Sequence, residues 1–243
     1  MVFQEPLTSL NPVFTIGEQI GEAVRTHESV ADDELVARCV RLLKDVGIPS
    51  AEERIKDYPH QLSGGQRQRV MIAMALACDP DLVIADEPTT ALDVTVQAQI
   101  LRLLDSIQRK RSMSVLYITH DLGVVGKIAD HVYVMYAGTI AEQGIKKAVF
   151  EDPRHPYTQA LLASIPHRSK RGKRLYSIAG TVPNPAYKPP GCPFHPRCTH
   201  AIDICREKFP DMCDYGDGHM ARCPVLFGDV EFDRRTELEE KCK

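Results

Sequence analysis

The sequence lacks the features of a membrane-spanning, secreted or strongly charged protein. No stretch approaches the 18 or more uninterrupted apolar residues that a membrane span needs, and no basic region followed by an apolar segment stands at the N-terminus. We therefore expect a cytosolic chain. The formal net charge of -3 provides no basic field for a phosphate backbone, which argues against nucleic-acid binding.

A phosphate-binding loop is also absent from the sequence. No Gly-x-x-x-x-Gly-Lys-Ser/Thr occurs, because Lys127 and Lys173 follow glycines but precede Ile128 and Arg174. The backbone amides and the lysine of such a loop make most of the contacts to nucleotide phosphates. We therefore do not expect this chain by itself to bind ATP tightly.

What is present predicts an α/β protein with an appendage. The chain has 243 residues, of which 43% are hydrophobic. Apolar spacing predicts two amphipathic helices between residues 15 and 47. Apolar runs at residues 82–85 and 115–118, on either side of a helical pattern at 94–108, predict a βαβ unit with parallel strands buried on both faces.

A hairpin and a change in composition follow the predicted βαβ unit. Residues 132–136 and 139–142 flank Ala137-Gly138, a pattern that predicts two antiparallel strands joined by a tight turn. From residue 153 prolines become frequent, and a cysteine-rich segment comes after them. We place a domain boundary near residue 150.

Three side chains that can take part in catalysis or ligand binding stand at the ends of the two predicted parallel strands. Asp86 and Glu87 end the first strand, and His120 comes directly after the second. The carboxyl ends of parallel strands meet at one edge of a sheet, where ligands bind. One carboxylate could hold magnesium, the next could orient or deprotonate a water, and the histidine could donate to a terminal phosphate. Against this, acidic residues commonly end strands, and a lone histidine is more often structural.

A second candidate site is the start of the predicted helix at residues 70–77. Ser63 and Gln66 have the spacing of a capping box, so an N-cap is the simpler interpretation. Two consecutive glycines, Gly64 and Gly65, lie between them, and each costs a helix about 1 kcal/mol relative to alanine. Their presence suggests a backbone that approaches something closely, and the amides of a helix N-terminus suit a phosphate.

Five cysteines are concentrated in one segment, at positions 192, 198, 205, 213 and 223. In a reducing compartment this concentration favours a metal site over disulfides. The spacing is neither that of zinc motifs nor that of ferredoxins, so it does not name the metal.

Several motifs together resemble those of ABC ATPases. The signature motif is similar to residues 62–66, the Walker B strand to residues 82–87, the D-loop to Ala91-Leu92-Asp93, the switch histidine to His120, and the Q-loop to Phe3-Gln4-Glu5-Pro6. Further matches resemble the oligopeptide, dipeptide and nickel importer subunits: Thr8-Ser9-Leu10-Asn11-Pro12, His155-Pro156-Tyr157-Thr158 and residues 191–198.

The resemblance implies a fold and a division of the chain. Residues 1–150 would form an ABC ATPase domain, which is a P-loop-NTPase-like parallel sheet with a helical subdomain at about residues 12–62 that docks against a permease. In the family the P-loop precedes the Q-loop, so we expect a fragment whose ATPase domain is incomplete at the N-terminus. Residues 151–243 would form a small cysteine-rich C-terminal domain of the oligopeptide-importer type.

The resemblance also implies a role for each site residue. Asp86 would be linked to Mg²⁺, Glu87 would be the general base, and His120 would sense the γ-phosphate of ATP. The other nucleotide-binding positions would be Gln4, Ser63, Gly64, Gly65, Gln66 and Asp93, with residues 63–66 closing on the nucleotide of a facing domain. A 4Fe-4S cluster, with Zn²⁺ as the alternative, would be held by Cys192, Cys198, Cys205 and Cys223, leaving Cys213 as an extra.

The implied function is ATP hydrolysis that drives peptide import, by a peripheral protein on the cytoplasmic face of the inner membrane. Without the P-loop, hydrolysis is expected of the complete protein. The implied partners are a second, identical or different, ATPase subunit, two permease subunits and, indirectly, an extracytoplasmic substrate-binding protein. The alternative is a non-hydrolytic partner subunit that lends residues 63–66 to another protein's nucleotide. A soluble ABC ATPase of DNA repair or translation is disfavoured by the cysteine-rich segment.

Overall fold

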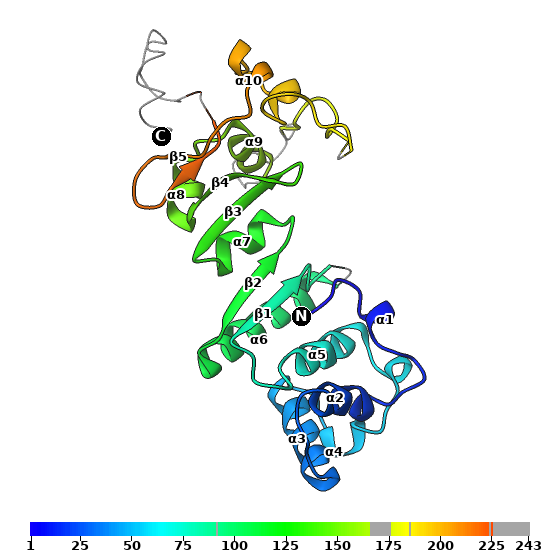
Figure 1. Ribbon diagram of the computed structural model, residues 1–243. Coiled ribbons are helices and arrows are strands. Elements are labelled where there is room, and N and C mark those ends of the chain that lie inside the picture. Colours follow the sequence, from blue (N-terminus) through cyan, green and yellow to red (C-terminus); the bar gives the residue numbers. More distant parts are fainter. Residues whose placement is uncertain (91, 166–175, 185, 224, 226–243) are drawn as a thin grey trace. The chain divides into compact units, whose positions relative to one another are not determined.

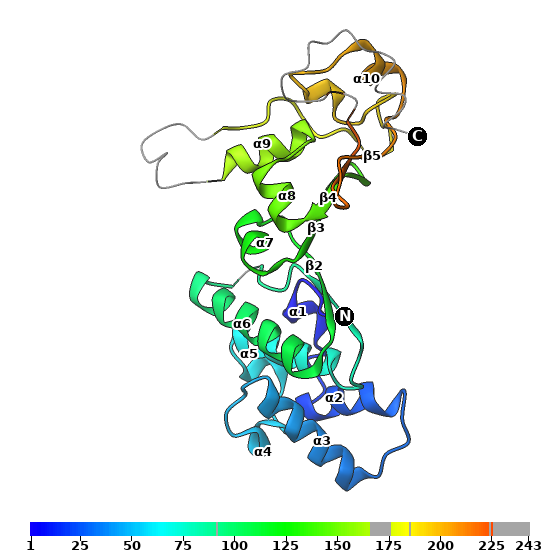
Figure 2. The ribbon, with the colours of Figure 1, turned by 90° about the vertical axis from the view of Figure 1, so that its left-hand side faces the viewer.

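The computed structural model describes residues 1–90, 92–165, 176–184, 186–223 and 225 (Figure 1). Ala91 of the predicted D-loop and the end of the predicted C-terminal domain, residues 226–243, lie outside this set. The chain forms two compact units, Met1–His120 and Asp121–Lys243. Figure 2 shows the same ribbon from the side. Each unit is described by itself.

The first unit is mostly helical and contains one pair of strands. Its elements are α1 (Pro6–Ser9), α2 (Ile16–Arg25), α3 (Asp32–Asp45), α4 (Ala51–Arg54), a 3₁₀ turn η1 (Pro59–Gln61), α5 (Gly64–Ala75), β1 (Leu82–Asp86), α6 (Val94–Arg111) and β2 (Ser114–Ile118).

The two predicted amphipathic helices are confirmed as α2 and α3. Thr15 begins α2 through a capping box with Glu18, and the apolar faces of both helices are buried in one core with α5. The chain at the end of α4 approaches α2 closely because Gly17 has no side chain: a Cβ there would lie 2.4 Å from Cγ1 of Ile55. The backbone amide of Gly17 also donates to the carbonyl of Ile55 at 2.8 Å.

The predicted βαβ unit is also confirmed. Strands β1 and β2 are parallel, with Asp86 opposite Ile118, and α6 connects them. The N-terminal segment joins on the far side of β1, where Val2 forms a parallel bridge with Ala85. This arrangement brings the residues that follow Val2, the end of β1 and the end of β2 to one edge of the sheet.

The expectation that both strands are buried on both faces is wrong for the described residues. Val83 and Ala85 are buried, but Leu82, Leu116 and Ile118 are 51%, 44% and 46% exposed. The helices account for this asymmetry, because Val83 shares its apolar cluster with residues of α5 and α6. Alternate strand residues point to opposite faces, so the side chains of the other face are left uncovered.

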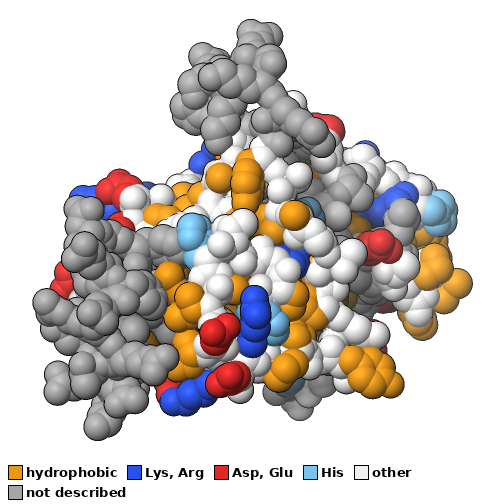
Figure 3. Space-filling view, turned by 90° about the horizontal axis from the view of Figure 1, so that it is seen from above, with side chains coloured by type: hydrophobic (Ala, Val, Ile, Leu, Met, Phe, Trp, Pro, Cys, Tyr) orange, Lys and Arg blue, Asp and Glu red, His pale blue; other side chains and the backbone are white. Residues whose placement is uncertain are grey.

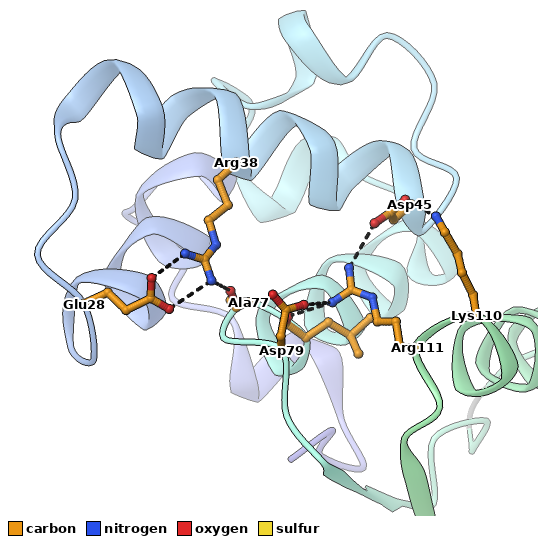
Figure 4. Close-up of polar contacts among 8 residues, drawn as sticks. Glu28, Arg38, Asp45, Ala77, Asp79, Lys110 and Arg111 are labelled. Carbon is orange, nitrogen blue, oxygen red and sulfur yellow. Dashed lines mark hydrogen bonds and ion pairs between the residues drawn. The ribbon is translucent and has the colours of Figure 1, made fainter.

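Two arginines, one from α3 and one from the end of α6, contact the segment that follows α5 (Figure 4). Arg38 of α3 pairs with Glu28 and donates to the carbonyl of Ala77 at 2.7 Å. At the end of α6, Arg111 bridges two carboxylates, donating to Asp45 at 3.0 Å and to Asp79. We call these contacts the arginine clasp; they satisfy carbonyls that a helix end leaves without partners.

The second unit is built around an antiparallel sheet. Its elements are α7 (Leu122–Ile128), β3 (His131–Tyr136), β4 (Thr139–Ile145), α8 (Lys146–Glu151), α9 (Pro156–Ser164), a 3₁₀ turn η3 (His195–Arg197), α10 (Asp203–Glu207), β5 (Cys213–Asp214) and β6 (Met220–Ala221). The sheet order is β3-β4-β6-β5, so the short C-terminal hairpin pairs with β4.

The predicted hairpin is confirmed, with Ala137 and Gly138 at positive φ in its turn. The compact units nevertheless divide after His120 and not at residue 150, where the sequence places the boundary. The reason is packing: Tyr136 and Ala141 of the hairpin share an apolar cluster with the cysteine-rich segment. The predicted domain limits, 1–150 and 151–243, stay a prediction.

Among the described helices, none is long and apolar enough to cross a membrane. On the face seen in Figure 3, acidic and basic side chains lie close to one another, between groups of apolar side chains.

Candidate functional site

Glu87 lies at the centre of a group of polar side chains beyond the end of β1. Its Oε1 is 2.8 Å from Nδ1 of His120, and its Oε2 accepts from Nε2 of Gln4 at 2.8 Å and from Oγ1 of Thr90 at 2.9 Å. The site is open: the Glu87 side chain is 21% exposed and that of His120 is 75% exposed. Three segments distant in sequence therefore meet at one carboxylate.

The parallel sheet explains why these side chains meet. The amide of Asp86 donates to the carbonyl of Val2, which sets the position of Gln4 two residues later. The amide of Glu87 donates to the carbonyl of Ile118, which sets the position of His120 in the same way. The expectation that the carboxylates and the histidine share one rim of a parallel sheet is thus met by Glu87 and His120, with Asp86 as the last residue of β1.

The backbone of Glu87 has an unusual conformation. Its φ is 42°, in the left-handed region that residues other than glycine rarely adopt. Such conformations persist where the surroundings fix them, and they concentrate at functional sites. Here the bond from the Glu87 amide to Ile118 and the bond from the Thr90 amide to the Glu87 carbonyl hold the turn.

The surroundings of Glu87 favour its charged form. The hydrogen bond with His120 lowers the pKa of the Glu87 carboxyl, and the bonds from Thr90 and Gln4 lower it further. An ionised carboxylate whose oxygens accept from fixed donors is suited to orient a water molecule and to take its proton.

The second predicted group surrounds a separate hollow between the starts of α5 and α6. The hollow has a volume of about 330 Å³ and is lined by Ser63, Gly64, Gly65, Gln66, Arg69, Leu92, Asp93, Val96 and Gln99. All of the predicted signature-motif residues from 63 to 66, together with Asp93, line it. The structure thus places the predicted nucleotide-binding residues in two groups, one at Glu87 and one at this hollow.

Local structure accounts for several residues of the hollow. The predicted capping box is confirmed, since Ser63 Oγ accepts from the Gln66 amide and Gln66 Oε1 accepts from the Ser63 amide. Asp93 begins α6 by accepting from the amides of Thr95 and Val96. These contacts are structural, and the roles of these residues towards a nucleotide stay predictions.

One glycine of the hollow has a packing reason that the sequence did not reveal. A Cβ at Gly65 would lie 2.8 Å from Cγ1 of Val96, whereas one at Gly64 would make an ordinary contact with Leu92 at 3.8 Å. The close approach predicted from the two glycines therefore exists within the chain, between the first turns of α5 and α6. It leaves Gly64 as the glycine that packing does not require.

Sequence reasoning missed Thr90. Its hydroxyl is one of the three donors on Glu87, and it comes from the turn that closes when the Thr90 amide bonds the Glu87 carbonyl. The available signal was a hydroxyl residue three positions after a glutamate, across a proline that favours a turn.

The four cysteines predicted as metal ligands lie in one small core. Cys192, Cys205 and Cys223 are buried in the same cluster, Cys198 packs against it, and all four are free thiols. The amide of Cys192 donates to the carbonyl of Cys205 at 2.8 Å, and the preceding Gly191 is required because a Cβ there would lie 2.4 Å from that carbonyl oxygen. Cys213 is not among the free thiols.

The arrangement of these thiols is nevertheless not that of a formed metal centre. Among the residues that the structure describes, no three histidine, cysteine, aspartate or glutamate side chains are placed to hold a metal ion together. Burial raises the pKa of Cys192 and Cys198, and raises that of Cys223 to about 12. The donor set has the right chemistry for iron or zinc, but the predicted 4Fe-4S or Zn²⁺ site finds no support in its geometry.

Two family models match separate parts of the chain, and several known proteins are similar to most of it. The family model for ABC transporters matches residues 1–90, and that for the oligopeptide/dipeptide transporter C-terminal region matches residues 141–205. Similar proteins include the dipeptide transport ATP-binding proteins DppD of Bacillus subtilis, 51% identical over 223 residues, and of Escherichia coli, 50% identical over 230. They also include the oligopeptide transport ATP-binding protein AppD of Bacillus subtilis, 52% identical over 223 residues.

The alignment with DppD of Bacillus subtilis covers 92% of this chain and 67% of that relative, and the alignment with DppD of Escherichia coli covers 95% and 70%. The alignment with AppD covers 92% of this chain and 68% of that relative. Two solved structures are similar over a smaller share. One is cbiO1 from Clostridium perfringens, part of the ABC transporter complex cbiONQ, with a TM-score of 0.55, 32% identity and coverage of 62% of this chain and 58% of that chain. The other is the ATP-binding cassette MJ0796 bound to ADP and Pi as a dimer, with a TM-score of 0.52, 29% identity and coverage of 60% and 61%.

Proposed function

The chain belongs to the ABC transporter ATPases, among the ATP-binding subunits of oligopeptide and dipeptide importers, and from this membership we propose that the complete protein hydrolyses ATP with Glu87 of this chain as general base. Hydrolysis energises the uptake of peptides through a membrane permease. The observation that carries the proposal is the convergence of Gln4, Thr90 and His120 on the Glu87 carboxylate at 2.8 to 2.9 Å.

In this mechanism Glu87 orients a water molecule and accepts its proton as the water attacks the γ-phosphate. Phosphoryl transfer passes through a loose transition state, so positioning and charge stabilisation matter more than the strength of the base. A carboxylate with a lowered pKa is therefore suitable if its direction is fixed. His120 contacts Glu87 and, being largely exposed, can also reach a phosphate oxygen.

The remaining predicted residues have supporting roles. Asp86, the carboxylate next to Glu87, would hold Mg²⁺, which would stabilise the negative charge of the phosphates. Gln4 would sense the metal and the γ-phosphate and couple the site to the permease. The hollow of residues 63–66 and Asp93 closes on a nucleotide held by a second ATPase subunit, whether identical or different. The position of these residues at the start of α5 and the volume of about 330 Å³ support this role.

The partners and location follow from the same membership. We propose that the protein is peripheral, at the cytoplasmic face of the membrane, with two permease subunits and an extracytoplasmic substrate-binding protein that reaches it only indirectly. The helices of the first unit, α2 and α3, would provide the docking face for the permease.

A Glu87→Gln variant tests the general base. In the complete transporter we expect ATP turnover to fall by about 10²- to 10⁴-fold, the usual contribution of a positioned acid or base. The ATP-bound dimer should accumulate, which size-exclusion chromatography with ATP detects. The matched control is Glu151→Gln, at an exposed position of α8, which should hydrolyse ATP at the unchanged rate. Undiminished hydrolysis by Glu87→Gln would remove Glu87 from its role.

The alternative function, a non-hydrolytic partner that only lends residues 63–66, gives a different result in the same assay. It predicts that Glu87→Gln changes nothing, while Ser63→Arg, which fills the hollow, abolishes the activity of the partner subunit.

We further propose that Cys192, Cys198, Cys205 and Cys223 bind a 4Fe-4S cluster, with Zn²⁺ as the alternative. The support is their common core and thiol chemistry. A bound cluster would replace the thiol protons and crosslink the cysteine-rich segment; no step of ATP hydrolysis passes through it. Anaerobic purification with iron, sulfide and zinc analysis decides between the two, with Cys198→Ser as the test variant and Cys78→Ser as the control. Metal-free protein from an anaerobic preparation would refute both.

A further inference from the structure

Thr90 is not among the residues for which family resemblance implies a role, yet it contacts the group on which the proposed chemistry depends. Its Oγ1 donates to Oε2 of Glu87 at 2.9 Å, and its amide donates to the Glu87 carbonyl at 3.1 Å. Pro88, between the two, is buried and favours the turn. The hydroxyl is therefore delivered to the carboxylate by a turn of four residues, and not by a distant segment.

We propose that Thr90 is the positioning residue of the general base: its hydroxyl holds the Glu87 carboxylate towards the attacking water throughout the reaction. The inference rests on the proposed function of Glu87. Thr90 does not itself touch the reacting atoms.

The other two donors cannot perform this task throughout the reaction. Gln4 and His120 are the residues expected to engage Mg²⁺ and the γ-phosphate, so nucleotide binding gives each of them a second partner that competes with Glu87. His120 is also 75% exposed and free to move. Thr90 sits three residues from Glu87 in the same turn and is half-buried, so its contact persists when the others exchange partners.

The backbone of Glu87 makes such a restraint necessary. Its φ of 42° directs the side chain from a conformation in which glutamate is rarely found. The amide bonds to Ile118 and from Thr90 fix that backbone, but they leave the side-chain torsions free. The hydrogen bond from the Thr90 hydroxyl to one carboxylate oxygen of Glu87 restrains these torsions. It leaves the second carboxylate oxygen available to the attacking water.

The test compares Thr90→Val with Thr90→Ser in the complete transporter. Valine keeps the shape of threonine without the hydroxyl, and we expect turnover to fall about tenfold, as for a hydrogen bond to a charged group at a partly exposed site. The KM for ATP should stay within about twofold. Serine restores the hydroxyl and should restore turnover. Thr89→Val, next in the chain, is the matched control and should behave as the unaltered protein.

Two results would overturn the inference: Thr90→Val with unaltered turnover, or Thr90→Ser as impaired as Thr90→Val, which would make the role one of shape. A melting curve identifies misfolding, in which case Thr90→Ala removes the hydroxyl with less bulk. Glu87→Gln in the same assay separates the two proposals. Retained turnover there refutes the general base itself, whereas its loss beside a fully active Thr90→Val refutes only the role of Thr90.

Discussion

Each compact unit contains a glutamate paired with a histidine, and the two pairs differ chiefly in exposure. In the first unit Glu87 lies 2.8 Å from His120, with the side chains 21% and 75% exposed. In the second unit Glu142 lies 2.7 Å from His219, with the side chains 0% and 7% exposed. The residue types and distances are nearly the same, so the environments must set the roles.

The partners of each carboxylate show what the difference means. Glu142 accepts from the backbone amides of Arg154 and His155 as well as from His219, and it thereby joins β4, the start of α9 and the C-terminal hairpin. Backbone donors in a closed core cannot exchange partners. Glu87 instead accepts from three side chains at an open edge, and two of them, Gln4 and His120, can turn towards a ligand. The buried pair is therefore structural, and the exposed pair is suited to chemistry.

Removing the buried carboxylate should give the largest effect on stability. Glu142→Ala leaves two buried donors and the part-buried amide of Arg154 without an acceptor. An unsatisfied buried donor costs about 1 to 3 kcal/mol, so we expect a loss of about 3 kcal/mol or more. Hydrogen exchange of the full chain, followed by mass spectrometry, locates the loss in the second unit. Glu87→Ala is the matched variant and should leave exchange unchanged. Equal losses of protection in the two variants would show that burial does not distinguish the roles of the two glutamates.

Acid should destabilise the second unit through His155. Burial lowers the pKa of His155 to about 4 from an ordinary value of 6.5. The unfolded chain then binds a proton that the folded chain does not. The contribution of His155 to the free energy of unfolding is therefore constant above about pH 6.5 and falls by about 3 kcal/mol as the pH drops to about 4. Urea unfolding at pH 7 and pH 4.5 measures this loss.

His155→Asn is the control for the acid effect. Asparagine cannot titrate, yet it can still accept from the Tyr157 amide at the start of α9, as His155 Nδ1 does at 3.0 Å. A variant that loses as much stability between the two pH values as the unaltered protein would show that another group causes the loss.

Breaking the arginine clasp should have a smaller effect and should be confined to the first unit. Arg111→Met removes contacts to Asp45, Asp79 and the Leu76 carbonyl, and because the Arg111 side chain is 20% exposed we expect a loss of about 1 to 2 kcal/mol. Chemical denaturation measures it. Arg109→Met, two residues away on α6, breaks a pair with Asp105 that is largely exposed and should cost less than about 0.5 kcal/mol. Equal costs would mean that the clasp contributes nothing beyond an ordinary surface pair.

Arg111 of the clasp and the loop from Glu87 lie at different ends of α6. Helix α6 has 18 residues, so its end at Arg111 lies about 27 Å from its start, where the loop from Glu87 arrives. The stabilising contacts of Arg111 and the proposed catalytic group at Glu87 are thus at opposite ends of the same helix.

The elements that position the site could be predicted from the sequence because their signals are local. Two apolar runs around a helical pattern predicted β1, α6 and β2, and the shared rim of parallel strands then predicted that Glu87 and His120 would meet. The capping box of Ser63 and Gln66 needed only a spacing of three residues. These features depend on periodicity and on the rules of parallel sheets.

The remaining features depend on contacts that spacing does not encode. Thr90 reaches Glu87 through a turn with an unusual backbone angle. Gly65 is required by Val96, which lies 31 positions later. The strands β5 and β6 have two residues each, too few for a period to be recognised. The cysteines illustrate the same limit, because four positions in a sequence give no distances between thiols.

The central claim is that Glu87 and His120 act as one unit on one phosphate, and a double-mutant cycle tests it most directly. ATP turnover is measured for Glu87→Gln, His120→Ala and the double variant in the complete transporter. Residues that act together are not additive, so the double variant should be no slower than the slower single variant. If the two losses multiply, the histidine and the carboxylate work independently, and the account given for this site is contradicted.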